Sequence, residues 1–187
     1  MNEEIKKLRK YFKDNFIGFR DANNGGQTLL MEIPKPIIEF FQNLNFQELS
    51  IESFGDDIVI PSLNTLDKAQ WGYSYNPKYQ SRIENWPKNW IVISYQGSMP
   101  FIYNTVTEKV GFAVVKGEGN WSAYWCFENI VQFFWVIGIT GGILVKDNRQ
   151  TYENGIPKKM LASAEEMLLS YCTKNEVDEC LKALSWK

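Results

Sequence analysis

The segment that decides the fold is Trp90-Ile-Val-Ile-Ser-Tyr-Gln-Gly-Ser-Met-Pro-Phe-Ile-Tyr-Asn104. Residues 90–95 and 99–104 are rich in β-branched and aromatic side chains, which favour strands. The intervening Gln96-Gly97-Ser98 has the composition of a tight turn, so the segment predicts a β-hairpin. Two further strands, at 110–115 and 122–126, are expected to follow after short turns. Strands that succeed one another without long crossovers indicate an antiparallel meander.

The alternation of side chains along these strands predicts which residues face the core. Side chains two apart lie on the same face of a strand, so Ile91 and Ile93 should point to one side. We expect one sheet core that contains Trp90, Ile91, Ile93, Ile102, Val114 and Trp125.

Helices are expected on both sides of these strands in the sequence. Amphipathic spacing predicts helices over 3–16, 37–44, 162–173 and 176–185, and Ser62 should cap a further helix that runs to Ala69 with Asp67 facing solvent. The apolar stretch 127–137 should be a buried helix, followed after Gly138, Gly141 and Gly142 by a strand at 143–145. Extended segments at 49–54 and 58–60 should flank a turn at Asp56-Asp57. One antiparallel sheet flanked by helices is an α+β fold.

Composition limits the possible chemistry. The 187 residues fit one domain, 1–187, and the 20 Lys+Arg against 22 Asp+Glu give a net charge of −2, which argues against direct nucleic-acid binding. The chain contains no histidine, which excludes Ser-His-Asp and Cys-His catalysis and histidine zinc sites. The three cysteines are widely spaced, so we expect no metal, no cofactor and no disulfide framework. The uncharged stretch 129–145 is shorter than the ~20 apolar residues of a membrane span, and we expect a cytoplasmic protein.

Charge and aromatic residues converge in one part of the chain. Residues 45–75 hold five acidic residues against one lysine, and six Trp and Tyr residues follow within 71–90. Such side chains anchor protein interfaces, although they can equally cover a sheet. We expect a partner-binding surface formed by Glu52, Asp56, Asp57, Trp71, Tyr73, Tyr75 and Trp86. The same carboxylates could instead serve acid–base catalysis in a histidine-free enzyme such as a glycan hydrolase.

The order of these motifs resembles the SUKH superfamily. The resemblance rests on the helix Pro34-Lys-Pro-Ile-Ile-Glu-Phe-Phe41, on the hairpin with Gly97 and Phe101-Ile-Tyr-Asn104, and on the step Trp125-Cys-Phe-Glu128 before a helix. It covers residues 34–135 and leaves 146–187 as a C-terminal helical extension. The family's Gly-Asp after the turn is replaced by Ser98-Met-Pro100, and its strand-ending Asp by Asn104, so the chain would be a divergent member.

The resemblance implies a non-catalytic protein-binding domain with a single sheet wrapped by helices. It implies an immunity protein that neutralises a polymorphic toxin of nuclease or deaminase type by occlusion, with a secreted toxin domain as the protein partner. A regulatory or scaffolding module, as in the fungal regulators of cell-wall glucan synthesis of the same superfamily, is the alternative. The sequence does not specify the oligomeric state.

Overall fold

A computed structural model describes residues 3–16, 18–22, 33–117, 119–147 and 155–187. Its helices are α1 (Glu3–Asn15), α2 (Lys35–Leu44), α3 (Ile130–Lys146), α4 (Lys158–Leu168) and α5 (Lys174–Ala183), with 3-10 turns η1 (Leu63–Thr65) and η2 (Lys68–Gln70). Its strands are β1 (Leu49–Ile51), β2 (Ile58–Ile60), β3 (Tyr75–Asn76), β4 (Ser81–Arg82), β5 (Trp90–Gln96), β6 (Met99–Asn104), β7 (Val110–Lys116) and β8 (Asn120–Phe127).

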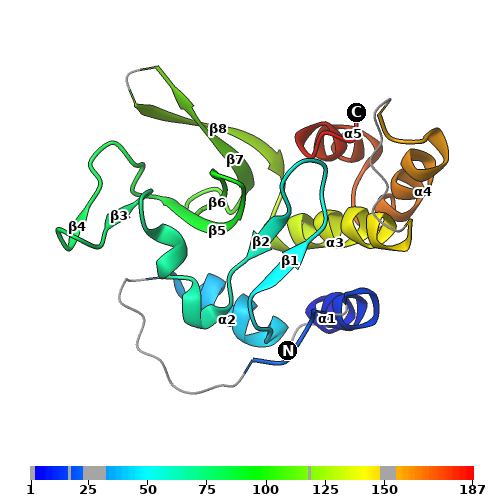
Figure 1. Cartoon of the computed structure of the whole chain (residues 1–187), viewed down its shortest axis with the longest axis horizontal. Coiled ribbons are helices and arrows are strands. Elements are labelled where there is room, and N and C mark those ends of the chain that lie inside the picture. The colour runs from blue at the N-terminus through cyan, green and yellow to red at the C-terminus, as the bar shows by residue number, and fades with distance from the viewer. Residues whose placement is uncertain (1–2, 17, 23–32, 118, 148–154) are drawn as a thin grey trace.

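Six strands form one sheet in the order β1-β2-β5-β6-β7-β8, and every neighbouring pair is antiparallel. The order in space therefore follows the order in the sequence, apart from the small β3–β4 ribbon that lies between β2 and β5 in the chain (Figure 1). The predicted α+β fold and the predicted meander are confirmed. The predicted turn at Asp56-Asp57 also lies between two strands, β1 and β2.

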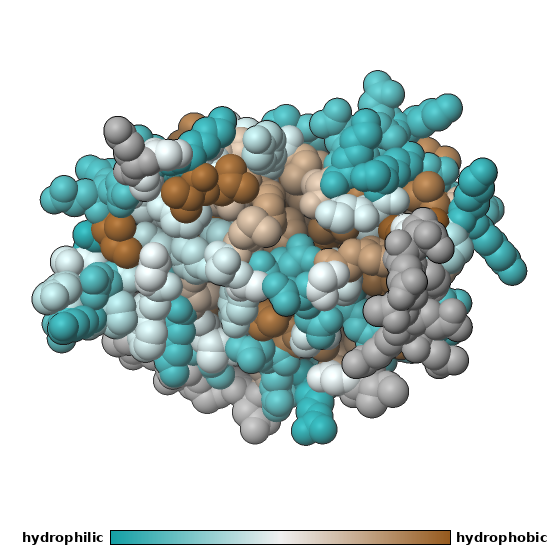
Figure 2. Space-filling view, turned by 45° about the horizontal axis from the view of Figure 1, so that its top comes forward, coloured by the Kyte–Doolittle hydropathy of each residue, from teal (hydrophilic) through white to brown (hydrophobic). Residues whose placement is uncertain are grey.

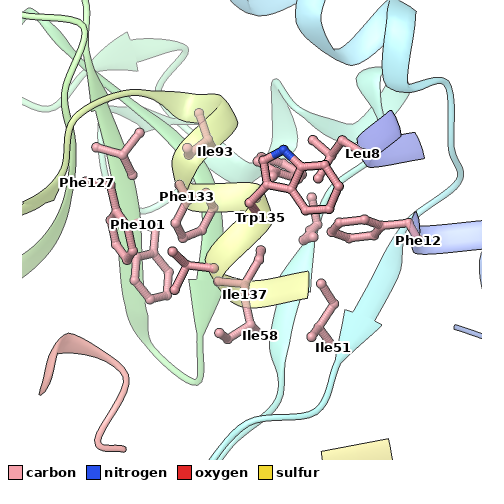
Figure 3. Close-up of a cluster of buried hydrophobic side chains, with 14 of the residues drawn as sticks. Leu8, Phe12, Ile51, Ile58, Ile93, Phe101, Phe127, Phe133, Trp135 and Ile137 are labelled. Carbon is pink, nitrogen blue, oxygen red and sulfur yellow. The ribbon is translucent and has the colours of Figure 1, made fainter. Parts of the chain in front are cut away.

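The main core lies between one face of the sheet and helices α1, α2 and α3. Phe101 and Phe127 of the strands pack against Phe133 of α3 (Figure 3). Phe12 of α1 lies against Phe134, also of α3. The absence of charged residues in α3 before Lys146 follows from this position, since most of the helix is buried.

The opposite face of the sheet carries a second, smaller core. It consists of Trp86, Trp90, Val92, Ile102 and Ala113, covered by residues 61–89. The expectation of one core was therefore wrong. Ile91 and Ile93 face the helices, Trp90 and Ile102 face the second core, and the half-buried Val114 belongs to neither core. The sheet is buried on both sides. Successive side chains of β5 therefore point alternately into the main core and into the second core, and not into a core and into solvent. Trp125, also expected in the core, is 37% exposed.

Helix α3 runs to Lys146, so the predicted strand at 143–145 does not exist. Its glycines permit close helix packing instead of ending the helix. A Cβ at Gly138 would lie 2.8 Å from the Phe12 ring, and one at Gly142 would lie 2.9 Å from the Tyr11 hydroxyl. Glycine is destabilising in an exposed helix, but in a buried helix it lets a neighbouring side chain approach the backbone.

Smaller differences concern the ends of helices. The helix predicted from Ser62 to Ala69 is two 3-10 turns. Asp67, expected to face solvent, is buried, and its Oδ1 accepts a hydrogen bond from the Lys68 amide. In the C-terminal extension, α4 and α5 begin earlier than expected and pack against α3 and β8 respectively. Residues 148–154 of this extension lie outside the described residues.

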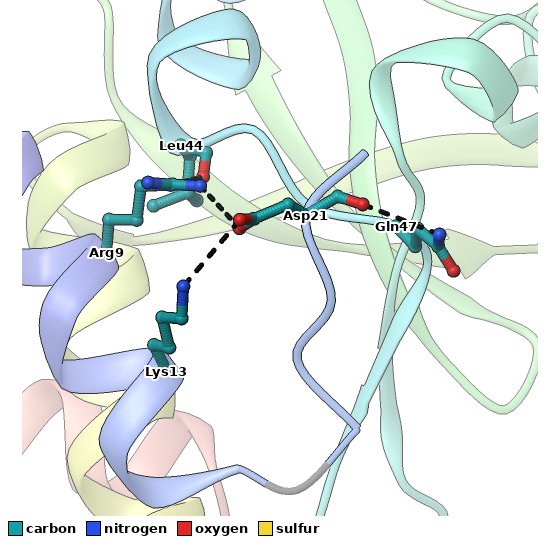
Figure 4. A network of polar contacts seen from close by, with 5 residues as sticks. All are labelled: Arg9, Lys13, Asp21, Leu44 and Gln47. Atoms are coloured by element: carbon teal, nitrogen blue, oxygen red, sulfur yellow. Dashed lines mark hydrogen bonds and ion pairs between the residues drawn. The ribbon is translucent and has the colours of Figure 1, made fainter. Parts of the chain in front are cut away.

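A polar network joins α1 to the chain around β1 (Figure 4). Arg9 donates from Nε to the Leu44 carbonyl at the end of α2 (2.9 Å) and pairs with Asp21, which also faces Lys13 at 3.6 Å. Gln47 reaches the Asp21 carbonyl at 3.5 Å. The network ties α1 and the end of α2 to the chain that enters the first strand. Within the described ranges, no helix is long and apolar enough to cross a membrane.

Candidate protein-binding face

A groove lies beside the second core, where η2 and its following residues approach the β5–β6 turn. It has a volume of about 300 Å³. It is lined by Glu48, Pro61, Thr65, Lys68, Ala69, Trp71, Tyr73, Tyr95 and Gly97. The lining combines a carboxylate with three aromatic side chains, and Lys68 is the basic residue in it.

The acidic β1–β2 turn adjoins this groove and is held by hydrogen bonds. Gln96 donates from Nε2 to the carbonyls of Phe54 and Asp56, each at 2.9 Å. Ser50 donates from Oγ to Oδ2 of Asp57 at 2.8 Å. A Cβ at Gly97 would collide with the Asp56 carboxylate, so this position requires glycine for space as well as for its φ of +56°. These contacts hold both exposed carboxylates of the turn in place, and the Asp56 carboxylate lies against Gly97 in the groove lining.

The aromatic side of the groove is anchored at one end and open at the other. Tyr73 donates from its hydroxyl to the Ser98 carbonyl (2.9 Å), and its ring lies 5.6 Å from that of Trp86. Burial raises the pKa of the Tyr73 hydroxyl. The pKa of the Tyr95 hydroxyl is also raised, mainly by burial and to a smaller extent by the nearby Glu48 carboxylate. Both hydroxyls are therefore neutral donors at neutral pH, while Trp71 is 38% exposed. We call Glu48, Asp56, Asp57, Trp71, Tyr73 and Tyr95 the acidic–aromatic face.

A buried amide positions the aromatic segment. Strand β5 pairs with β2 only near its end, at Tyr95 and Gln96, which leaves the β2-facing edge of its first residues without a strand. The Gln70 side chain makes the hydrogen bonds that a neighbouring strand would make. Its Oε1 accepts from the Val92 amide at 2.9 Å, and its Nε2 donates to the Val92 carbonyl at 2.7 Å. Gln70 is fully buried. It thereby fixes the chain immediately before Trp71 and Tyr73.

The structure brings together four of the seven residues that the sequence predicted. Asp56, Asp57, Trp71 and Tyr73 belong to the acidic–aromatic face. Trp86 does not, because it is 2% exposed and forms the centre of the second core. Glu52 is half-buried, and its Oε2 is shielded from solvent.

Tyr75 lies in a different hollow, of about 700 Å³, whose charged lining residues are Lys35, Arg82 and Lys88. The surroundings of Tyr75 are thus basic. The aromatic segment 71–90 is therefore divided between the acidic–aromatic face and this basic hollow. Sequence reasoning missed Tyr95 and Glu48 as members of the face. A signal existed for Glu48, which belongs to the acidic stretch 45–75, whereas Tyr95 could not be told from a core strand residue.

The chemistry available on this face is that of charge and aromatic contact. In the part of the chain that the structure describes, no three His, Cys, Asp or Glu residues are grouped so that they could hold a metal ion. Comparison with known proteins finds no family model, no curated protein and no solved structure that matches the chain. The interpretation of the site therefore rests on its own geometry.

Proposed function

We propose that the protein is a non-catalytic binding domain that recognises a protein partner through the acidic–aromatic face. The observation that carries this proposal is the joint placement of exposed carboxylates and half-exposed aromatic side chains around one groove. Tyr and Trp supply large contact areas with few rotatable bonds, which is why they dominate binding energies at interfaces. Carboxylates at the rim attract a basic partner and orient it during encounter.

The rigidity of the face supports this role. The Gln96 amide and the Ser50 hydroxyl hold the acidic turn, and the Tyr73 hydroxyl holds the aromatic side against the β5–β6 turn. A surface that is already ordered loses little conformational entropy on binding. Such a face is better suited to binding a folded partner than to binding a flexible peptide by mutual adjustment.

The partner that we propose is a toxin domain of nuclease or deaminase type, and the protein would be its cytoplasmic immunity protein. Enzymes that act on nucleic acids carry basic clefts because their substrate is a polyanion. An acidic surface with aromatic anchors can cover such a cleft and exclude the substrate. The sequence resemblance to SUKH proteins points to the same kind of partner, and the net charge of −2 is compatible with it.

The experiment is co-expression of the full chain with the product of the open reading frame next to its gene, followed by purification, an activity assay and stopped-flow measurement of the association rate. We expect a stoichiometric complex and loss of toxin activity on its nucleic-acid substrate. The Asp56→Lys/Asp57→Lys variant should associate at least about tenfold more slowly at low ionic strength, and added salt should reduce the difference.

The matched control reverses two exposed carboxylates elsewhere, in Glu39→Lys/Glu166→Lys on α2 and α4. It should leave the association rate almost unchanged. Equal effects of the two double variants would mean that net charge, and not this face, governs binding. A complex that forms without loss of toxin activity would contradict the immunity role and favour a scaffolding one.

A further inference from the structure

Strand β8 is an edge of the sheet, and its composition is unusual for an edge. Its residues Asn120-Trp-Ser-Ala-Tyr-Trp-Cys-Phe127 include no charged residue and no proline. Edge strands expose unpaired backbone amides and carbonyls, and most are protected by lysine, proline, a bulge or short length. The opposite edge strand, β1, is protected by its short length of three residues. The bulge of β8 lies at Cys126, near the end of the strand, so the residues before it form a regular edge without charge, which suggests that something pairs with it.

The first part of β8 is open and the last part is covered. Residues 121–125 are all at least partly exposed, with Tyr124 at 61% and Trp125 at 37%. At Cys126 the edge is closed, because α5 packs there and the Cys180 thiol donates to the Cys126 carbonyl at 3.1 Å. Figure 2 shows hydrophobic side chains exposed over the β7–β8 hairpin. An incoming strand has five residues available to it, from Trp121 to Trp125.

We propose that a second copy of this chain occupies this edge, with the two β8 strands antiparallel and Ala123 opposite its own counterpart. A two-fold axis perpendicular to the joined sheet places one residue opposite itself. With the axis at Ala123, the open stretch pairs completely and stops where α5 begins. Trp121 then faces the second copy's Trp125, and Ser122 faces the second copy's Tyr124.

The side chains are complementary in this register. The Trp121 and Trp125 rings already pack on the second core, Trp121 at 4.9 Å from Trp86 and Trp125 at 5.6 Å from Trp90. Pairing two such strands adds aromatic cross-strand contacts on the same face of the sheet, which stabilise antiparallel pairs. The small Ala123 side chains at the centre leave space for the flanking rings. No charged side chain of either strand is desolvated.

Charges at the two ends also match. Lys116 lies opposite Asn120 in the β7–β8 pair. In the proposed dimer this end of the hairpin approaches the second copy's Cys126. Glu179 immediately precedes Cys180, whose thiol donates to the Cys126 carbonyl. Lys116 and the second copy's Glu179 therefore lie toward the same end of the proposed interface, with opposite charges. The acidic–aromatic face lies on the same face of the sheet but toward the opposite edge, around β1, β2 and the β5–β6 turn, and its Tyr73 ring lies 5.9 Å from that of Trp121. The strand pairing uses the backbone edge of β8 and does not depend on the proposed function.

The test measures the mass of the full chain by sedimentation velocity from about 1 to about 300 μM, the range suited to a small interface. We expect a monomer–dimer equilibrium. In Ser122→Lys/Tyr124→Lys, two pairs of like charges oppose each other across the axis, so the dissociation constant should rise about tenfold or more. Ser122→Glu/Tyr124→Glu should weaken self-association in the same way.

The decisive sample is an equimolar mixture of the Lys and Glu variants. It should form a heterodimer at least as tight as the wild-type dimer, because each lysine then faces a glutamate. This rescue shows that both variants fold, and Val106→Lys, at a site 76% exposed in the β6–β7 turn, is the control that should leave the equilibrium unchanged. A wild-type chain that is monomeric throughout, larger aggregates in place of dimers, or absence of rescue would each overturn the proposal.

Discussion

Replacing Gln70 with leucine should destabilise the protein although the volume of the side chain is nearly kept. The Gln70 amide makes three hydrogen bonds inside the protein, two with the Val92 backbone and one from Nε2 to the Leu66 carbonyl at 3.0 Å. Leucine can make none of them. The Val92 amide and carbonyl would then be buried between the sheet and its cover without partners.

The magnitude follows from the number of groups left unpaired. Three backbone groups lose a partner at about 1–3 kcal/mol each, and leucine burial returns about 1.5–3 kcal/mol, so the free energy of unfolding should fall by roughly 2–6 kcal/mol. Most of the loss should come from Val92, because both of its backbone polar groups are affected.

Urea unfolding, followed by circular dichroism, measures this change directly. The control is Gln47→Leu, since Gln47 is exposed and its amide reaches the Asp21 carbonyl only at 3.5 Å. The control should change the free energy of unfolding by less than about 0.5 kcal/mol. If Gln70→Leu is as stable as the control, water reaches the Val92 groups, and the reasoning about a sealed strand edge is wrong.

Three other predictions concern packing and charge. Trp86→Ala should lower the free energy of unfolding by about 3–5 kcal/mol, whereas Trp71→Ala should lower it by less than about 1 kcal/mol in the same urea titration and should instead weaken partner binding. Gly141→Ala should cost about 1–3 kcal/mol, because the new methyl group would collide with Ile51 and lie 3.1 Å from the Glu52 carbonyl; an unchanged melting temperature would contradict this packing. Hydrogen bonds from Lys182 and Lys187 lower the pKa of Asp178 from 3.8 to about 2, so its pairing stabilises the fold above pH 3.8 and is lost as the pH falls toward 2. Asp178→Asn should therefore lose stability relative to the wild type at pH 6 but not at pH 2 in thermal melts.

Much of the sheet could be predicted from the sequence because its signals are local. Strands β5 to β8 follow one another with glycine or polar turns between them, and such neighbours pair by default. The face of each side chain was harder to predict. Ile91 and Trp90 are both buried, since helices cover one side of the sheet and residues 61–89 cover the other. Hydrophobic alternation separates core from solvent, but it carries no signal that separates one core from another.

The errors in α3 and in the binding face have a common cause in tertiary contact. Gly138 and Gly142 suggest a helix end in isolation, whereas next to Phe12 and Tyr11 they allow the helix to continue. Gln70 is a polar residue in an irregular segment, and only the unpaired edge of β5 gives its amide a structural role. Trp71 and Trp86 have similar sequence surroundings, and the fold alone decides that one is half-exposed and the other buried.

The position of residues 61–89 has a consequence for how the protein can evolve. Strands β2 and β5 are antiparallel neighbours, and a short hairpin would be enough to join them. The long excursion between them is therefore not needed for the topology, and the helices of the main core pack on the other face of the sheet. Substitutions at the exposed positions of this excursion, such as Trp71, can accumulate with little effect on the fold, whereas the buried Leu66, Gln70 and Trp86 must be kept. If the partner changes during evolution, the exposed residues of this excursion could change with it while the sheet and the helices of the main core stay the same.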